Sequence, residues 1–358
     1  MASEHDEDRA AYTRYTQRRV LFVLGCLLVI FVAIGTSVTV GGRELSVIEV
    51  YEVIFRHLSG AAYDIGSSAW MDDHIVWDIR LPRAVFAVIA GAGLALSGTA
   101  MQGVMRNPLA DPYITGISSG ACLGVAVAAV LGFQVMNGGQ NSGAVVNAFV
   151  FALIPMIIII VLAPAGRTSP ATLILAGVAI SYLFNALTTI VLTMTDSETL
   201  ATVYAWQIGS LSDITWDCLP VPVLTTALGA AALILCARQL NILSLGDAQA
   251  TALGLNPDRL RIVMLVMMTL IVASVVAYAG IIGFIGLVCP HIVRMLIGGD
   301  NRFVIPAAAL LGAAFLLVCD ILSRAISDVE SVPVGVVVSF IGAPIFLYLI
   351  IRQSKSMW

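Results

Sequence analysis

Long runs of apolar residues, separated by short polar segments, extend from near residue 20 almost to the end of the chain. A helix needs about 20 apolar residues to cross the roughly 30 Å hydrocarbon layer of a membrane. Runs of suitable length cover residues 20–40, 82–104, 112–132, 144–164, 171–194, 218–237, 262–280, 282–297, 304–323 and 334–351. The pattern predicts an all-α, polytopic membrane protein with about ten transmembrane helices. The run 282–297 is short and contains Pro290, so we expect this helix to be tilted or broken.

The composition agrees with a protein whose main solvent is lipid. Of the 358 residues, 59% are hydrophobic and only 11% are charged, whereas a soluble domain carries about 25% charged residues. The net charge of −4 argues against a nucleic-acid partner. We therefore expect a single transmembrane domain at 20–352, embedded in a lipid bilayer and preceded by a polar N-terminal tail at 1–19.

Basic residues indicate how the helices are oriented, because cytoplasmic loops are enriched in arginine and lysine. With the N-terminus placed in the cytoplasm, 13 of the 18 basic residues lie on the cytoplasmic side and 5 lie outside. An even number of spans then returns the C-terminus to the cytoplasm. The expected location is the cytoplasmic membrane, with both termini inside the cell.

Two further segments are predicted to be helical without crossing the membrane. One covers 197–209 on the outer side, and the other covers 244–254 on the inner side. In the second, Ser244 can cap a helix with Asp247 completing a capping box, while Gly254 suits a left-handed end. About nine residues form only about 14 Å of helix, which is too short for a span. The segment is either a connector on the membrane surface or a helix that docks into another protein.

Several kinds of chemistry lack the residues that they need. A nucleotide-binding loop requires a Gly-Lys pair followed by Ser or Thr, and the only lysine is Lys355. The six cysteines are scattered without a CxxC pair, and Cys289 with His291 supplies at most two metal ligands. We therefore expect no enzyme activity, no metal site and no cofactor. If ATP drives this protein, a partner must hydrolyse it.

A polar stripe follows the run 171–194 at helical spacing, through Ser181, Asn185, Thr188 and Thr189. Such side chains are costly in hydrocarbon unless they find partners or face water. The stripe is either a set of interhelical hydrogen bonds or the wall of a transport pathway. It contains no carboxylate, and the one acid within a span, Asp320, lies near the outer end. This argues against an ion-coupled secondary transporter, which is the main alternative.

Three arginines at the outer side depart from the inside bias: Arg80, Arg83 and Arg324. Arginines at an interface commonly anchor a helix by reaching the headgroups. Guanidinium groups also bind carboxylates well. An external protein partner that bears carboxylates is therefore an alternative role for these side chains.

Several motifs, in order along nearly the whole chain, resemble those of the FecCD family of ABC importer permeases. They are Arg80–Arg83, Gly91–Gly98, Met101–Gln102, Asn107–Pro112, Gly246–Gly254, Gly283–Arg294 and Pro333–Phe346. The resemblance implies a type II importer permease fold and a homodimer that encloses one pathway. It also implies two cytoplasmic ATP-binding subunits, an extracytoplasmic substrate-binding protein, and a metal chelate such as a ferric siderophore, haem or a corrinoid as cargo.

The resemblance also suggests roles for particular residues. It implies that the ATPases contact a coupling helix that contains Gly246, Asp247, Ala250, Leu253 and Gly254. It implies that Arg80, Arg83 and Arg324 dock the binding protein. We expect Arg83→Glu to weaken that docking without changing expression. We expect the translocation pathway to follow Ser181, Asn185, Thr188 and Thr189.

Overall fold

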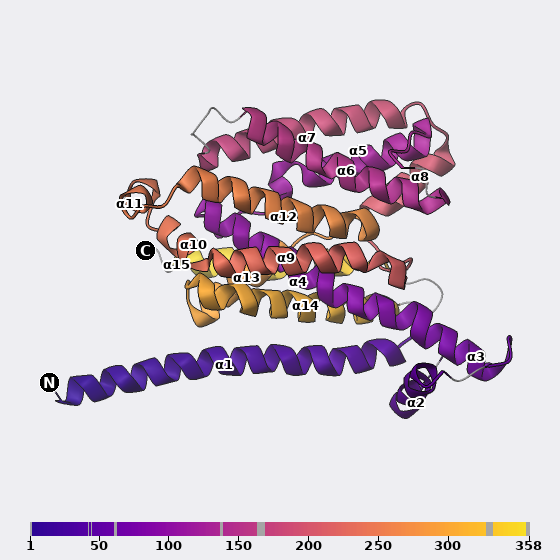
Figure 1. The fold of residues 1–358 in the computed structure, drawn as a ribbon, viewed down its shortest axis with the longest axis horizontal. Helices are drawn as coiled ribbons and strands as arrows, with labels where there is room; N and C mark the ends of the chain where they lie inside the picture. Colours follow the sequence, from indigo (N-terminus) through magenta and orange to yellow (C-terminus); the bar gives the residue numbers. More distant parts are fainter. Residues whose placement is uncertain are drawn as a thin grey trace.

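The computed structural model describes the backbone of residues 2–41, 43, 45–60, 63–136, 139–162, 169–326 and 332–355. Within these residues ten long helices form one bundle (Figure 1). They are α1 (Ala2–Thr39), α4 (Leu81–Met105), α5 (Ile117–Leu131), α6 (Gly139–Leu162), α7 (Pro170–Leu192), α9 (Pro220–Leu235), α12 (Pro257–Ala279), α13 (Ile285–Ile297), α14 (Asn301–Ala325) and α15 (Val334–Lys355). The predicted all-α fold is confirmed, and the segment 1–19 continues into α1 from Ala2 onwards.

Eight of these helices are long and apolar enough to cross a membrane, while α5 and α13 are shorter apolar helices. The prediction of a span over 112–132 was therefore too long. Pro112–Thr115 forms a separate 3-10 turn, η2, and Gly116 has a φ of 89° that ends it before α5 begins. The run 282–297 is not broken at Pro290, which lies inside the continuous helix α13, but the helix is shorter than the run. Gly280 and Phe284 have φ values of 69° and 64°, so α13 begins only at Ile285.

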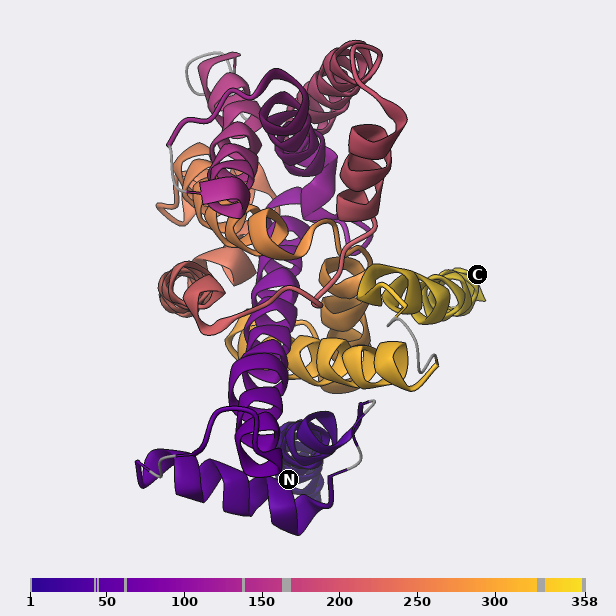
Figure 2. The same cartoon turned by 90° about the vertical axis from the view of Figure 1, so that its right-hand side faces the viewer.

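Helix α4 occupies the centre of the bundle and packs against α14, α12, α13 and α9 (Figures 1 and 2). Glycines allow two of these contacts to be close. A Cβ atom on Gly91 would collide with the backbone of Gly312 in α14, and one on Gly98 would collide with Gly286 in α13. Close backbone approach of this kind is a common way for membrane helices to associate. As a result α4 is mostly buried, whereas α7 at the edge of the bundle is mostly exposed.

The two ends of the bundle carry different short helices (Figure 1). At one end lie α10 (Ala237–Leu243) and α11 (Asp247–Ala252), together with the start of α1 and the end of α15. We call this the α11 end. The opposite end, the α2 end, carries α2 (Val47–Leu58), α3 (Ser68–Asp73) and α8 (Ser197–Gln207). A π-helical segment, η1 (His74–Arg80), joins α3 to α4.

The apolar pattern predicts no spanning helix between residues 40 and 82, and the structure has only short helices there. Helix α2 nevertheless has a readable start. Ser46 and Glu49 form a complete capping box, in which each side chain bonds to the backbone of the other residue. The sequence signal for α2 was therefore present in a segment that the span pattern leaves unassigned.

Candidate transport pathway and partner-binding segments

The turn between α10 and α11 differs from the predicted capping arrangement. Ser244 does not cap α11; it ends α10, and its Oγ donates to the carbonyl of Asn241 at 2.6 Å. Gly246 precedes α11 with a φ of 112°, a conformation that favours glycine. The chain thus turns sharply at Gly246. Asp247 takes no part in the predicted capping box, and its carboxylate pairs with another helix.

Asp247 ties α11 to the core of the bundle. Its carboxylate accepts two hydrogen bonds from Arg261 of α12, at 3.0 and 2.7 Å. Arg106, directly after α4, approaches the same carboxylate at 3.5 Å. The hydrogen bonds from Arg261 hold the pKa of Asp247 below its usual range. The carboxylate is therefore ionised at neutral pH, and the pair is lost only in acid, as the pH falls through that lowered pKa.

The C-terminal end of α11 agrees with the prediction. Gly254 has a φ of 82°, and the amide of Leu255 donates to the carbonyl of Ala250 at 3.0 Å. This is the hydrogen bond of a Schellman motif. Ala250 is buried against the bundle. The opposite side of this segment presents exposed apolar residues, which are Leu245, Ala248, Ala252 and Leu253.

The predicted polar stripe on α7 is divided between two faces. Asn185 and Thr189 are exposed, and Ser181 is partly exposed. Thr188 is only 5% exposed, and its hydroxyl donates to the carbonyl of Phe184 within the same helix. Thr188 thus differs from the expectation that all four side chains share one open wall.

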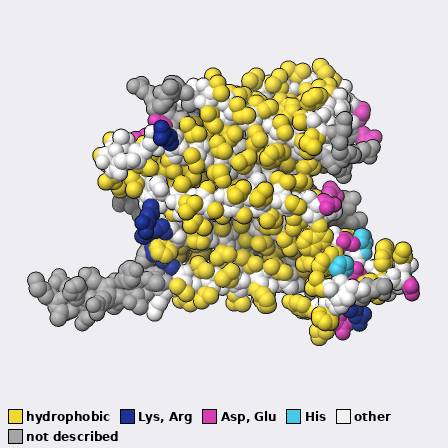
Figure 3. Space-filling model, viewed as in Figure 1, with side chains coloured by type: hydrophobic (Ala, Val, Ile, Leu, Met, Phe, Trp, Pro, Cys, Tyr) yellow, Lys and Arg dark blue, Asp and Glu magenta, His cyan; other side chains and the backbone are white. Residues whose placement is uncertain are grey.

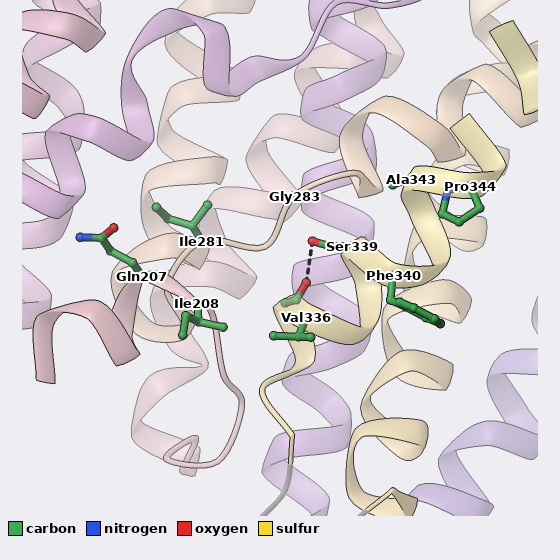
Figure 4. A pocket seen from close by; sticks show the side chains of 10 residues that line it. Gln207, Ile208, Ile281, Gly283, Val336, Ser339, Phe340, Ala343 and Pro344 are labelled. Carbon is green, nitrogen blue, oxygen red and sulfur yellow. Dashed lines mark hydrogen bonds between the residues drawn. The ribbon is translucent and has the colours of Figure 1, made fainter. Parts of the chain in front are cut away.

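Helices α7, α8 and α15 lie on the same side of the bundle (Figure 2). We call this side the α7–α8–α15 face. An open pocket of about 770 Å³ lies on it, between the end of α8, the loop before α13 and the first half of α15 (Figure 4). Its lining residues are Gln207, Ile208, Ile281, Gly283, Gly335, Val336, Ser339, Phe340, Ala343 and Pro344. The lining is largely apolar, so the pocket suits a bulky ligand surface rather than a small ion.

The residues of this pocket were not predicted from the sequence. The pocket joins α8 to α15, which are far apart along the chain. Two of its polar side chains are hydrogen-bonded to other groups of the protein. Ser339 donates to the carbonyl of Gly335 at 2.8 Å (Figure 4). Gln207 donates to the Cys122 sulfur at 2.9 Å. No spacing pattern in the sequence marks such a surface.

Cysteine accessibility tests the division of the α7 stripe. In a chain without its native cysteines, Asn185→Cys and Thr189→Cys are expected to react with a water-soluble thiol reagent in at least one transport state. Thr188→Cys is the matched control and should stay protected, because that position is buried. Protection of Asn185→Cys and Thr189→Cys in every state would show that these positions do not line a water-filled pathway.

Arg80 and Arg324, two of the three arginines that depart from the predicted inside bias, hold the C-terminal end of α1. Arg80 donates to the carbonyls of Val38 and Thr39 at 2.8 and 2.9 Å. Arg324 donates to the carbonyl of Ser37 at 2.8 Å. The last carbonyls of a helix lack partners within the helix, and cations near them interact favourably with its dipole. The two guanidinium groups therefore join α1 to the end of η1 and to α14.

The third arginine, Arg83, is part of a buried ionic cluster. Its Nε donates to Asp320 at 2.7 Å, and Arg324 lies 3.0 Å from the other oxygen of the same carboxylate. The side chain of Asp320 is 0% exposed, and those of both arginines are 9% exposed. Arg83→Glu would place two carboxylates together in this buried site. Unchanged expression of that variant is therefore no longer expected, and docking by these arginines stays a prediction.

Comparisons with known proteins extend these observations. The sequence matches the FecCD transport family over residues 27–352. It is 39% identical over 343 residues to the hemin transport system permease protein HmuU of Yersinia pestis, covering 95% of this chain and 98% of that protein. It is also 39% identical to the cobalamin import system permease protein BtuC of Halobacterium salinarum, covering 77% of this chain and 73% of that protein.

A solved structure shows the same arrangement of helices. It is described as an inward-facing conformation of a metal-chelate type ABC transporter, and it matches this chain with a TM-score of 0.79 at 29% identity. The match covers 92% of this chain and 98% of that chain. The helical bundle described above is therefore the fold of a transporter subunit.

Proposed function

This chain belongs to the FecCD transport family, and we propose that it is the membrane-spanning permease subunit of an ATP-driven importer for a metal chelate. The observation that carries this proposal is the construction of the α11 end. A short helix lies outside the spans, presents exposed apolar residues, and is bonded through Asp247 to the buried Arg261 of α12. Such a helix suits a partner that drives the bundle mechanically.

We propose that the α11 end faces the cytoplasm and that the protein lies in the cytoplasmic membrane with both termini inside. The distribution of 13 against 5 basic residues supports this orientation. Most of the arginine side chains visible in Figure 3 lie at the α11 end, while acidic and histidine side chains gather at the α2 end. The side between the two ends is mostly hydrophobic, as lipid contact requires (Figure 3).

In the proposed assembly two copies of this chain meet around the α7–α8–α15 face and enclose one pathway. The open apolar pocket on that face and the exposed Asn185 and Thr189 support this arrangement. Two ATP-binding subunits contact α11, and a substrate-binding protein docks at the α2 end, where Arg80, Arg83 and Arg324 lie. The cargo is a ferric siderophore, haem or a corrinoid. The chain itself performs no covalent chemistry.

Dependence on ATP distinguishes this function from the ion-coupled alternative. In proteoliposomes that contain this chain, its partner ATPase and its binding protein, we expect uptake of chelate only when ATP is supplied on the α11 side. A dissipated proton or sodium gradient should leave uptake unchanged. Uptake by this chain without the ATPase would support the secondary transporter instead.

A substitution on α11 tests the proposed contact with the ATPase. Leu253 is 62% exposed, so Leu253→Asp should leave the fold intact. A charge in an apolar interface must lose its hydration on docking, so we expect ATP hydrolysis to continue while transport is largely lost. Leu253→Met, which keeps an apolar side chain of similar size, is the matched control and should transport normally. Full transport by Leu253→Asp would show that α11 is only a surface connector.

A further inference from the structure

Helix α2 carries three kinds of surface. Its inner face packs on the chain through Val50, Val53 and Ile54. Its polar face carries Glu49, Glu52 and Arg56. Between these lies a second apolar face, and its side chains are all exposed in the structure: Val47, Ile48, Tyr51, Phe55 and Leu58. The apolar arc of α2 is thus wider than its contact with the chain requires.

The uncovered face of α2 consists of large apolar side chains, two of them aromatic. Ile48 and Phe55 are 76% and 74% exposed, and Leu58 is 71% exposed. Side chains of this size gain by leaving water, so some apolar medium should cover them. The face also includes the aromatic rings of Tyr51 and Phe55, and aromatic side chains are common where proteins cross the boundary between lipid and water.

The orientation of α2 matches that boundary. It is seen end-on in Figure 1, where the long helices run across the view, and side-on in Figure 2, which looks along the bundle from the α2 end. The helix is therefore roughly perpendicular to the spanning helices and parallel to the membrane plane. Figure 3 shows hydrophobic side chains in this region side by side with basic, acidic and histidine side chains, as expected where lipid meets water.

We propose that α2 is an interfacial membrane anchor, with its uncovered apolar face inserted among the lipid headgroups and upper acyl chains at the α2 end. An in-plane helix with one apolar and one charged face is the form that such anchors take. A second copy of the chain is a poorer occupant, because α2 lies on a different side of the bundle from α7 and α8 (Figure 2). A protein that approaches from the water would meet the charged face first.

The attachment of α2 makes this anchor rigid. Val50 is 3% exposed and packs with Val38 of α1 and Val76 of η1. At the other end of α2, His57 lies 2.9 Å from the Asp73 carboxylate and stacks on Trp77 at 4.0 Å between ring centroids. Because α2 is attached to both α1 and η1, its insertion would fix the depth of α1 and of the η1–α4 helix in the membrane.

Spin labels on α2 test this proposal in the full chain, reconstituted in phosphatidylethanolamine–phosphatidylglycerol vesicles without partner proteins. In a variant that lacks the native cysteines, labels at Ile48→Cys and Phe55→Cys should collide readily with oxygen, which dissolves in lipid, and poorly with a water-soluble nickel chelate. A label at Glu52→Cys, on the polar face, is the matched control and should show the reverse preference.

Other accessibility patterns would overturn the anchor. Nickel access at Phe55→Cys equal to that at Glu52→Cys would place the face in water. Exclusion of both reagents at Ile48→Cys and Phe55→Cys would show that another copy of the chain covers it. If the cysteine-free variant does not fold, tryptophan fluorescence in the native background replaces the labels. Brominated phospholipids should then quench the emission added by Phe55→Trp more strongly than that added by Glu52→Trp, and equal quenching would contradict insertion.

Discussion

Asp320→Ala is expected to lower the free energy of unfolding by about 3–5 kcal/mol, because it leaves buried arginines without their counter-charge. Asp320 is 0% exposed and lies 2.7 Å from Arg83 and 3.0 Å from Arg324. Arg324 also holds the end of α1. Loss of the carboxylate should therefore loosen the contact of α1 with α14 as well. Thermal unfolding of the purified protein in detergent or nanodiscs measures the effect.

Two further variants separate charge from general damage. Asp320→Asn keeps the size of the side chain but removes its charge, so it should be nearly as unstable as Asp320→Ala. Asp213→Ala, at an exposed aspartate near the same end, is the matched control and should change stability by less than about 0.5 kcal/mol. Native-like stability of Asp320→Asn would contradict the prediction, because it would show that Arg83 and Arg324 do not need the charge of Asp320.

The same cluster determines how docking can be tested. Substitution of Arg83 is expected to disturb folding as well as the predicted docking, so weak docking by Arg83→Glu would not identify the cause. The charge can instead be reversed on the binding protein, which leaves the permease unchanged. Loss of docking by acidic-to-basic variants of that protein, with a dependence on salt, would support a role for the arginines.

The number of long helices could be predicted from the sequence because each apolar run fixes a local structure. The turn chemistry was predicted less well. Gly254 ends α11 as its residue type suggests, but Ser244 does not cap that helix, because Ser244 ends α10 and the turn at Gly246 starts α11 only at Asp247. The Asp247 carboxylate pairs with Arg261 instead. That pair joins residues 14 apart across a turn, and the pair of Arg83 with Asp320 joins residues 237 apart. Periodicity contains no information about such partners.

The candidate site shows the same limit. Exposure of Asn185 and burial of Thr188 both follow from how α7 packs, although the two residues lie on neighbouring turns of one polar stripe. The pocket depends on the meeting of α8 with α15, which only the folded chain brings about. The start of α2 could have been predicted, because Ser46 and Glu49 have the spacing of a capping box. A search for spans alone passes over such a helix.

The pair of Asp247 with Arg261 gives an asymmetric prediction. Arg261 is 1% exposed, whereas the side chain of Asp247 is 43% exposed. Asp247→Asn should cost about 3 kcal/mol of stability, because it leaves a buried guanidinium whose nearest remaining carboxylate, Asp258, is 4.0 Å away. Arg261→Met should cost only about 1–2 kcal/mol, because an apolar side chain fills the buried site and water solvates the remaining carboxylate. Unfolding measurements on both variants test this order.

Transport measurements on the same variants test whether the pair of Asp247 with Arg261 couples movement of α11 to movement of α12. Both substitutions cut the bond between α11 and α12, so under the proposed function both should lower the chelate transported per ATP hydrolysed by a similar factor, despite their different stabilities. Arg106→Gln is the matched control; Arg106 is 36% exposed and 3.5 Å from Asp247, so its loss should alter neither property much. If transport instead falls in proportion to stability, the pair only maintains the fold. Equal stability of Asp247→Asn and Arg261→Met would contradict the assigned burial of the arginine.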